Sequence, residues 1–506
     1  MVMQRIAFRT DANSEIGTGH FMRCLSLAAE LKKTIPEIVF ITRGLPAFLA
    51  QELRKNSIEI LELPVSFEEV VDSLVSPNWL KISQAQDVQD TMAALAQRVY
   101  DWLIVDHYAL DNNWETPIRS RAKKIMVIDD LADRKHDCDL LLDQNYYHDM
   151  HQRYVGKVSN SCQLLLGPSY ALLREEFRDM RTQVKPRLGF VKNLLVFFGG
   201  VDSYNYTGTV LSAIVASNQQ VSVDVVIGQQ HPNLHELINF CKESCFSYHI
   251  QTNKMAVLMA KADLSIGAGG TAIWERFCMG LPSICISTVE NQEQQVADLM
   301  NENLVIAKQR KQNVFEFIER VLIEVKRKPN YLANMSKSVY DLVDGNGVKK
   351  IAISLIVHGL KIRMAKLSDS KNIFNWRNHP KIRSNSRSTE LIEWTDHEKW
   401  FVNTCGHKNS PILIGEIEGQ ALGVVRFDIQ ESCAEVSIFR VPYAGHKGVG
   451  RKLLIEAESW LKLNHPDVKV LHAQVLKKNE LSINLFEKSQ YVKIARAAHI
   501  EFVKQL

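Results

Sequence analysis

The sequence lacks long apolar runs and carries little net charge. No stretch reaches the roughly 18 uninterrupted apolar residues that a membrane-spanning helix needs, so no membrane span is predicted. The net charge is only +4 over 506 residues, which argues against a nucleic-acid partner. Residues 6–10 already read as an apolar strand, so no signal peptide is predicted. A content of 46% hydrophobic and 23% charged residues is typical of a folded globular protein.

Cysteine is also scarce and shows no pattern. The nine cysteines are odd in number and scattered, which favours a reducing compartment and predicts a cytoplasmic protein. Cys241 and Cys245 lie close together, but no second cysteine or histidine pair completes a zinc site, so no metal is predicted. The chain has no internal repeats and no low-complexity tract, and its length allows about three domains.

A glycine-containing loop near the N-terminus places a histidine at a strand-to-helix junction. Gly17 and Gly19 lie between the apolar residues 6–10 and a stretch of helical apolar spacing at residues 21–31. His20 therefore stands at the end of an α/β sheet where ligands bind. The helix dipole disfavours the imidazolium form, and a neutral imidazole can act as a general base. A histidine that only caps the helix fits this segment equally well.

A second glycine-rich turn lies in the middle of the chain. Residues 264–267 read as a strand, followed by Gly269, Gly270 and Thr271 and by a helix that carries Glu275. Backbone N–H groups and the threonine hydroxyl suit a diphosphate at the start of this helix, and Glu275 can accept hydrogen bonds from ribose hydroxyls. An ordinary strand–helix crossover without a ligand is the alternative.

These two segments belong to a series of motifs that spans roughly residues 1–355. The motifs are Gly17-Thr-Gly-His20, Asp106-His-Tyr108, Ile128-Asp-Asp-Leu131, Cys138-Asp-Leu-Leu-Leu-Asp-Gln-Asn145, Gly167-Pro-Ser-Tyr-Ala-Leu-Leu-Arg174, Phe198-Gly-Gly-Val-Asp202, Gly267-Ala-Gly-Gly-Thr271, Glu290-Asn-Gln292 and Asp344-Gly-Asn-Gly347. In this order they resemble the UDP-sugar hydrolases of pseudaminic acid biosynthesis. The turn with Glu275 also resembles the nucleotide-sugar site of GT-B-type glycosyltransferases.

This resemblance implies two GT-B-type lobes that hydrolyse a UDP-activated amino sugar without a metal. It implies that His20 is the catalytic base and Asn291 a second catalytic residue. The implied UDP-binding residues are Gly269, Gly270, Thr271 and Glu275. Residues near strand ends at the same cleft are candidates for sugar binding, with turn or capping roles equally open, namely Asp11, Gly17, Asp106, His107 and Tyr108.

The C-terminal region carries a third glycine-rich turn. Residues 435–441 read as a strand, and Gly448-Val-Gly-Arg451 opens an amphipathic helix. Residues 479–491 follow with the sequence Asn-Glu-Leu-Ser-Ile-Asn-Leu-Phe-Glu-Lys-Ser-Gln-Tyr. Together these segments resemble the acetyl-CoA-binding core of GCN5-related N-acetyltransferases (GNAT). The acetyl-CoA-binding residues implied by the resemblance are Val441, Lys447, Gly448, Val449, Gly450, Arg451, Asn479 and Ser482.

The same region indicates how an amine would be acetylated. Glu435 on the strand before the turn is the candidate general base. Many relatives use a tyrosine as general acid at the position of Phe486, so Tyr491, Tyr443 or water must take this role here. Residues 376–380 and 393–401 contain aromatic side chains that either line the acceptor side or belong to the core.

The predicted fold is α/β throughout, with two doubly wound Rossmann-like lobes of the GT-B type followed by a mixed α/β GNAT domain. The predicted domains are residues 1–180, 190–358 and 359–506. Strands are predicted in the first lobe near residues 6–10, 39, 102–106, 124–129 and 140–142. Those of the second lobe are predicted near residues 193–199, 221–227, 264–267 and 283–286.

The two resemblances together predict consecutive reactions. The first is acetyl-CoA-dependent N-acetylation of a UDP-4-amino sugar. The second is release of UDP from UDP-2,4-diacetamido-2,4,6-trideoxy-β-L-altropyranose. The alternatives are a GT-B glycosyltransferase fused to an acetyltransferase for another amine, and a degenerate C-terminal domain that acts only as a binding module.

Overall fold

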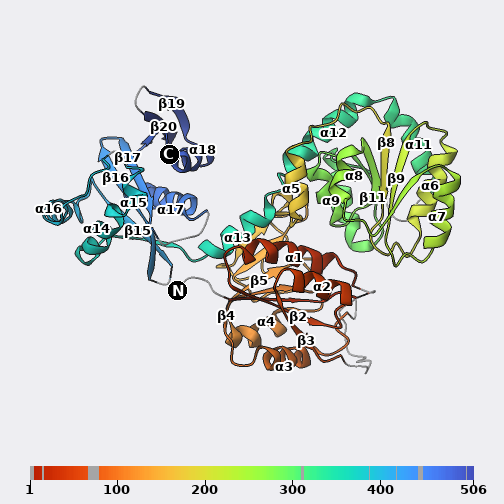
Figure 1. The fold of residues 1–506 in the computed structure, drawn as a ribbon, viewed down its shortest axis with the longest axis horizontal. Helices are drawn as coiled ribbons and strands as arrows, with labels where there is room; N and C mark the ends of the chain where they lie inside the picture. The colour runs from red at the N-terminus through yellow and green to blue at the C-terminus, as the bar shows by residue number, and fades with distance from the viewer. Residues whose placement is uncertain are drawn as a thin grey trace. The chain divides into compact units, whose positions relative to one another are not determined.

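The computed structural model describes residues 5–13, 16–65, 79–308, 313–386, 388–417, 419–442, 448–496 and 499–506. Contacts between residues divide the chain into two compact units, Met3–Ala352 and Ile353–Leu506. The first unit holds two sheets and the second holds one (Figure 1). None of the helices in the described ranges combines the length and the hydropathy that a membrane span requires.

The first sheet has seven parallel strands in the order β3-β2-β1-β4-β5-β6-β7. They are β1 (Arg5–Thr10), β2 (Glu37–Arg43), β3 (Glu59–Leu63), β4 (Tyr100–Asp106), β5 (Ala122–Ile128), β6 (Leu140–Asp143) and β7 (Gln163–Leu166). The strand order reverses between β1 and β4. The carboxyl ends of these two strands therefore flank a topological switch point, where open α/β sheets bind ligands.

Helices cover both faces of this sheet because successive side chains of a buried strand point to opposite layers. Phe40 of β2 contacts Phe21 of α1 (Gly19–Lys32), with ring centroids 5.3 Å apart. Its neighbour Val39 lies in the opposite layer with Val88 of α3 (Gln84–Leu95) and Trp114 of α4 (Asn112–Ile118). The helix α2 (Ala47–Lys55) follows β2.

The second sheet has six parallel strands in the order β10-β9-β8-β11-β12-β13. They are β8 (Asn193–Phe197), β9 (Ser222–Ile227), β10 (Ser247–Ile250), β11 (Leu264–Ala268), β12 (Ser283–Ile286) and β13 (Ile306–Lys308). Its switch point lies between β8 and β11. The prediction of two doubly wound parallel sheets is therefore confirmed.

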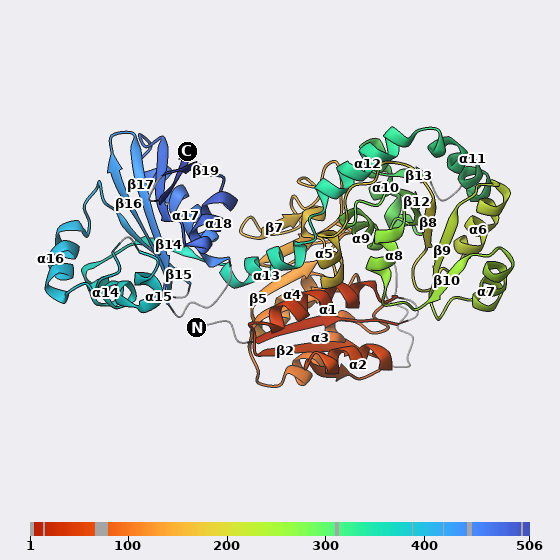
Figure 2. The same cartoon turned by 45° about the horizontal axis from the view of Figure 1, so that its top comes forward.

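Two helical layers enclose the second sheet (Figure 2). One layer contains α6 (Tyr206–Ala216), α7 (Leu234–Glu243) and α11 (Val314–Lys326). The other contains α5 (Glu175–Arg181), α8 (Met255–Lys261), α9 (Ala272–Cys278), α10 (Glu293–Asn301) and α12 (Pro329–Leu342). Phe177 of α5 is buried with Trp274 and Phe277 of α9, so α5 packs in the second lobe although it precedes β8.

The second unit contains a seven-stranded mixed sheet in the order β14-β15-β16-β17-β18-β20-β19. Its strands are β14 (Lys361–Met364), β15 (Ile412–Ile417), β16 (Gln420–Gln430), β17 (Cys433–Arg440), β18 (Val470–Leu476), β19 (Val492–Ala495) and β20 (His499–Gln505). The helices α17 (Val449–Asn464) and α18 (Glu480–Lys488) pack on one face. The helices α14 (Ser370–Asn378) and α16 (Trp394–Thr404) pack on the other, and α15 (Pro380–Arg383) follows α14.

Two features of this unit bear on function. In the described strands, the parallel ladder between β17 and β18 ends at Glu435, which pairs with His472, whereas β18 continues to pair with β20 as far as Leu476. The two strands therefore diverge beyond Glu435, as expected of a GNAT sheet.

The helix α13 (Gly347–Val357) contributes its last residue, Val357, to an apolar cluster with Leu422 and Val449.

Candidate functional site

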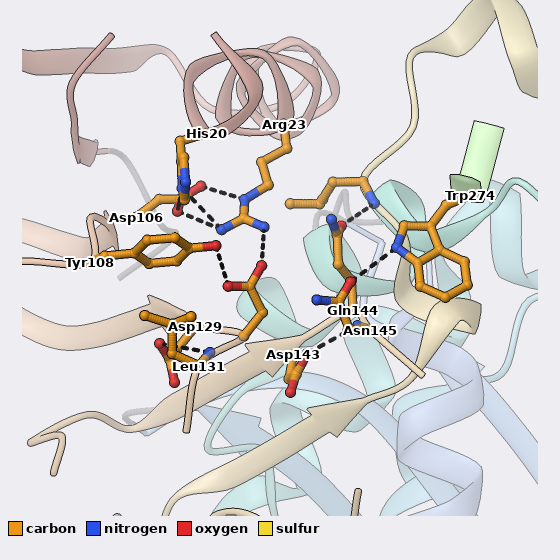
Figure 3. A network of polar contacts seen from close by, with 12 residues as sticks. His20, Arg23, Asp106, Tyr108, Asp129, Leu131, Asp143, Gln144, Asn145 and Trp274 are labelled. Carbon is orange, nitrogen blue, oxygen red and sulfur yellow. Dashed lines mark hydrogen bonds and ion pairs between the residues drawn. The ribbon is translucent and has the colours of Figure 1, made fainter. Parts of the chain in front are cut away.

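His20 lies in the first turn of α1, beside the switch point of the first sheet. Its Nδ1 atom is 2.6 Å from Oδ1 of Asp106, the last residue of β4 (Figure 3). Since a carboxylate only accepts, Nδ1 carries the proton and donates it to Asp106. Nε2 then keeps the lone pair that a general base needs, and 11% of the side chain is exposed. The structure thus brings together two residues that the sequence placed at separate strand ends.

Arg23, which was not among the residues predicted from the sequence, binds the same carboxylate (Figure 3). Its Nε donates to Oδ2 of Asp106 at 2.6 Å, and Nη2 donates to Oδ1 at 2.7 Å. Its Nη1 donates to Oδ2 of Asp130 at 3.0 Å. Burial alone would raise the pKa of Asp106, but the charge of Arg23 and the hydrogen bonds from Arg23 and His20 outweigh it and hold that pKa below its usual range. Because Arg23 follows His20 by one helical turn, helical periodicity was a signal that could have identified it.

Two aromatic rings line the side of His20. The Tyr108 ring is perpendicular to the imidazole, with centroids 4.5 Å apart, and its hydroxyl donates to Asp130. Trp79, also missed from the sequence, stacks on Tyr108 at 4.8 Å and meets the edge of His20 at 5.7 Å. The rings of Tyr108 and Trp79 thus form an apolar surface beside the His20 imidazole and hold it in one plane.

Asp11 and His107, two candidates for sugar binding, form a separate buried pair. Arg9 donates to both oxygens of Asp11, at 2.5 and 3.0 Å, and the backbone N–H of Arg43 donates to it at 2.8 Å. Nδ1 of His107 accepts from the N–H of Ala109, so the proton sits on Nε2, which lies 3.2 Å from Asp11. Each of the pair is only 3% exposed. This geometry favours a framework role for both.

The glycine turns of the two lobes lie side by side. A Cβ on Gly19 would stand 3.8 Å from Oγ1 of Thr271. The neighbouring Gly17 has φ +77° and donates its N–H to Asn13, which closes the first loop. The two turns therefore approach each other next to His20.

The residues of the second turn have different roles. The N–H of Gly269 donates to Ile286 at 3.2 Å, and a Cβ there would come within 2.3 Å of Val296. Gly269 is therefore required for close packing, and Gly270 and Thr271 remain the candidate donors to a diphosphate.

The remaining candidates of the second lobe lie around this turn. Oε1 of Glu275 accepts from Nη2 of Arg174 at 3.4 Å, and its side chain is 18% exposed. Burial raises the pKa of Glu275, and Arg174 opposes this shift. Asn291 is exposed in a short 3₁₀ segment (Glu290–Gln292), and a Cβ on Gly270 would lie 3.2 Å from Nε2 of Gln292. The catalytic role of Asn291 stays a prediction.

A further hydrogen bond joins the lobes. Nε1 of Trp274 donates to Oδ1 of Asn145 at 3.1 Å (Figure 3). Asn145 follows β6, and its own N–H donates to Asp143 at 3.0 Å. Gln144 between them accepts from the N–H of Leu172. The motif of residues 138–145 therefore fixes the first lobe to the helix that follows the second glycine turn.

In the C-terminal unit, the third glycine turn precedes α17. Gly448 has φ +92°, and a Cβ there would lie 2.6 Å from Cγ2 of Ile353, so the position requires glycine. A Cβ on Gly450 would meet only ordinary contacts, the nearest being Cδ of Arg440 at 3.8 Å. Lys447 lies outside the described residues. The turn thus presents its backbone at the start of a sixteen-residue helix.

The other predicted acetyl-CoA residues surround this turn. Val449 is fully buried, Arg451 is exposed, and the N–H of Val441 donates to Leu422 at 2.9 Å. Oδ1 of Asn479 accepts from the N–H of Ser482 at 3.1 Å, which caps α18. Contact of these residues with acetyl-CoA stays a prediction.

Tyr491, suggested above as the general acid, is unsuitable for that role. Its hydroxyl is buried and donates to Glu458 at 2.8 Å, and Lys504 holds the same carboxylate at 2.6 Å. Burial raises the pKa of Tyr491, and Glu458 raises it further. Phe486 is also buried and contacts Tyr491. Tyr443, the other suggestion, lies outside the described residues.

A cavity of about 330 Å³ opens on the face of the sheet opposite α17. Its polar lining includes Arg377, Asp396, Arg426 and Ser437, and Trp400 forms part of its wall. Ser437 and Glu435 are alternate residues of β17 and therefore point to the same face. The structure thus assigns Trp400 to the cavity, whereas the neighbouring Phe401 is fully buried in the core.

In the part of the chain that the structure describes, no group of three or more His, Cys, Asp or Glu side chains is arranged to hold a metal ion.

Comparison with protein families assigns two regions of the chain. Residues 371–491 match the acetyltransferase (GNAT) family. Residues 194–353 match the glycosyltransferase family 28 C-terminal domain. The chain fuses these two kinds of domain.

Two curated relatives each match one part of the chain, and a third matches its whole length. Over 291 residues the chain is 25% identical to the UDP-2,4-diacetamido-2,4,6-trideoxy-β-L-altropyranose hydrolase of Campylobacter jejuni, covering 57% of this chain and 93% of that protein. Over 122 residues it is 29% identical to acetyltransferase PseH of the same organism, covering 24% of this chain and 75% of PseH. Protein MJ1062 of Methanocaldococcus jannaschii is 24% identical and aligns over 99% of both chains. The chain is thus homologous to a nucleotide-sugar hydrolase and to an acetyltransferase.

Proposed function

We propose that this chain catalyses two consecutive reactions on a UDP-activated amino sugar. The C-terminal domain acetylates the 4-amino group with acetyl-CoA, and the two lobes then hydrolyse the product, UDP-2,4-diacetamido-2,4,6-trideoxy-β-L-altropyranose. One observation carries the proposal: two C. jejuni enzymes that are separate proteins have homologues fused in this chain. If the two enzymes act consecutively, the product of the acetyltransferase domain is the substrate of the hydrolase lobes. This relation gives a reason for the fusion that two unrelated activities would not.

The hydrolytic step uses the His20–Asp106 pair. Nε2 of His20 takes a proton from water as the water oxygen bonds to the anomeric carbon, while Asp106 holds the ring and stabilises the imidazolium. The bond between the anomeric carbon and the phosphate oxygen breaks, and UDP leaves with the electron pair. Gly270 and Thr271 donate to its diphosphate, and Glu275 accepts from the ribose.

The acetylation step uses the divergent strands of the GNAT sheet. The turn at Gly448 and Gly450 binds the pyrophosphate of acetyl-CoA, and the cavity beside Ser437 holds the amine. Glu435 takes the proton from the ammonium group, directly or through water. The amine nitrogen bonds to the acetyl carbon, the thioester C–S bond breaks, the nitrogen releases its second proton to solvent, and solvent protonates the CoA thiolate. The cavity's two arginines suit an acceptor that carries a diphosphate.

We also propose residues 1–180, 190–358 and 359–506 as the functional regions. A fragment that begins at residue 359 would lack Ile353, which contacts the glycine turn, and Val357, which is buried beside Val449. Variants in the full chain therefore separate the two activities more cleanly than truncation does.

Glycosyl transfer is the alternative for the two lobes, because family 28 domains include glycosyltransferases. Incubation of the full chain with the UDP-diacetamido sugar and no acceptor distinguishes the two reactions. Free sugar and UDP in equal amounts support hydrolysis. Turnover that appears only when an acceptor is added supports transfer.

Replacing Glu275 with alanine is expected to weaken UDP binding. Each lost charge-assisted hydrogen bond to the ribose costs about 1.5–3 kcal/mol, which corresponds to about a 10- to 150-fold rise in Kd. Calorimetry with UDP measures this change. We expect KM to rise more than kcat falls, because the ribose contact is made in both the ground state and the transition state. Glu316→Ala, on α11 and the opposite face of the sheet, is the control. Wild-type affinity in Glu275→Ala would remove this residue from the site.

A further inference from the structure

We propose that Arg23 is a positioning residue that orients Asp106 and keeps His20 in the form that accepts a proton. This inference rests on the proposed hydrolysis, but it concerns a residue to which neither the sequence motifs nor the comparisons assign a role. Arg23 touches no reacting atom in this account. It acts through the carboxylate that His20 shares with it.

The Arg23 guanidinium binds Asp106 as a two-pronged fork, with one N–H on each carboxylate oxygen at 2.6 and 2.7 Å. The third contact, to Asp130 at 3.0 Å, ties the fork to the segment after β5. Its side chain is only 4% exposed, so the fork cannot swing into solvent. A planar fork fixes the plane of a carboxylate, and the plane of Asp106 fixes the direction of the imidazole.

Arg23 also acts through its charge. Nη2 of Arg23 lies 3.2 Å from Nδ1 of His20, and both atoms carry protons, so no hydrogen bond forms between them. The cluster contains two carboxylates, Asp106 and Asp130, and one permanent cation. Without that cation, both carboxylates would favour the imidazolium, which cannot act as a base. Arg23 therefore offsets their charge at the position where a second positive charge would otherwise form.

Other groups around His20 leave this assignment unchanged. Tyr108 donates its hydroxyl to Asp130, and the thiol of Cys24 on α1 lies 3.5 Å from Oδ2 of Asp106. Burial raises the pKa of both of these groups well above their usual range, so both stay neutral in the working range of pH. Trp79 does not titrate. Arg153 donates to the backbone carbonyl of Asp130 at 2.9 Å, not to its carboxylate. Among the described side chains that contact the carboxylates of Asp106 and Asp130, Arg23 supplies the permanent positive charge.

The test compares two arginines with matching contacts. Arg119 also donates two hydrogen bonds to one carboxylate, that of Asp137 at 2.9 and 2.7 Å, and a third to Asp139 at 3.0 Å. It precedes β5 and therefore lies at the amino-terminal ends of the strands, whereas Arg23 lies near their carboxyl ends. Arg23→Gln is expected to move the acid limb of the pH profile of kcat/KM up by about 1–3 pH units. Arg119→Gln is expected to leave that limb in place. A folded Arg23→Gln protein with an unshifted acid limb overturns the proposal.

Two further measurements keep the test decisive. Arg23→Lys retains the cation but loses the fork, so we expect an acid limb within about 1 pH unit of wild type and a kcat lowered by about 10-fold or more. Wild-type kcat in Arg23→Lys would refute the positioning role. NMR titration of the His20 ring needs no substrate, and its midpoint should rise in Arg23→Gln even if the natural substrate differs from the proposed one. Wild-type protein that releases no UDP would instead overturn the proposed function alone.

Discussion

Replacing His20 with alanine is expected to slow UDP release by about 10²- to 10⁴-fold, the usual contribution of a general base. The reason lies in the geometry: Asp106 holds Nδ1 of the ring at 2.6 Å and leaves Nε2 to accept a proton from water. UDP affinity should stay within about 3-fold of wild type, because the proposed UDP contacts come from the second lobe. Release of UDP, followed in a coupled assay, gives kcat, and calorimetry gives the affinity.

A second buried histidine provides the control for this variant. His136 in the same lobe also places Nδ1 against a carboxylate, 2.7 Å from Glu115, but it lies in the segment between β5 and β6 and not beside the glycine turns. We expect His136→Gln to lower the melting temperature and to retain activity in the protein that remains folded. Wild-type turnover by His20→Ala would show that His20 only caps α1.

Replacing Gly450 with aspartate is expected to weaken acetyl-CoA binding by on the order of 10²- to 10³-fold. A carboxylate about 4 Å from a phosphate oxygen repels it by on the order of 4 kcal/mol at an effective dielectric constant of about 20. The variant should fold, because a Cβ at Gly450 meets only ordinary contacts and an acidic residue suits the first turn of a helix. Fluorescence or calorimetric titration with acetyl-CoA measures the loss.

Gly450→Asn is the matched control for charge, since asparagine has nearly the same size and no charge. We expect it to bind acetyl-CoA more tightly than Gly450→Asp by about 10-fold or more. UDP release from the diacetamido sugar should be unchanged in both variants. Equal, wild-type affinity in both would place the pyrophosphate elsewhere.

The central strands could be predicted from the sequence, but the edge strands could not. All nine strands predicted for the two lobes are present, whereas β3, β7, β10 and β13 were missed. These four are the outermost strands of their sheets. One side of each edge strand meets solvent, so polar residues such as Glu59, Glu62 and His249 interrupt the apolar run. A continuous apolar run, on which the prediction relied, is a property of buried parallel strands.

The sites could be predicted only in part, for a similar reason. The glycine turns that lead into the helices of His20 and Glu275 are local sequence signals, whereas the partners of His20 depend on tertiary contacts. Asp106 joins His20 from another strand, and Trp79 joins it from a segment without any motif. Motifs also could not separate donors from packing residues, because whether the N–H of Gly269 is already bonded depends on β12.

The most direct test of the two-step account is mass spectrometry of one reaction. The full chain is incubated with acetyl-CoA and UDP-4-amino-4,6-dideoxy-β-L-AltNAc, and the sugars are followed over time. The account predicts free diacetamido sugar, UDP and CoA in equal amounts. It also predicts accumulation of the acetylated UDP-sugar with His20→Ala, and unchanged substrate with Gly450→Asp. A wild-type chain that hydrolyses the diacetamido UDP-sugar but never acetylates the 4-amino precursor would contradict it.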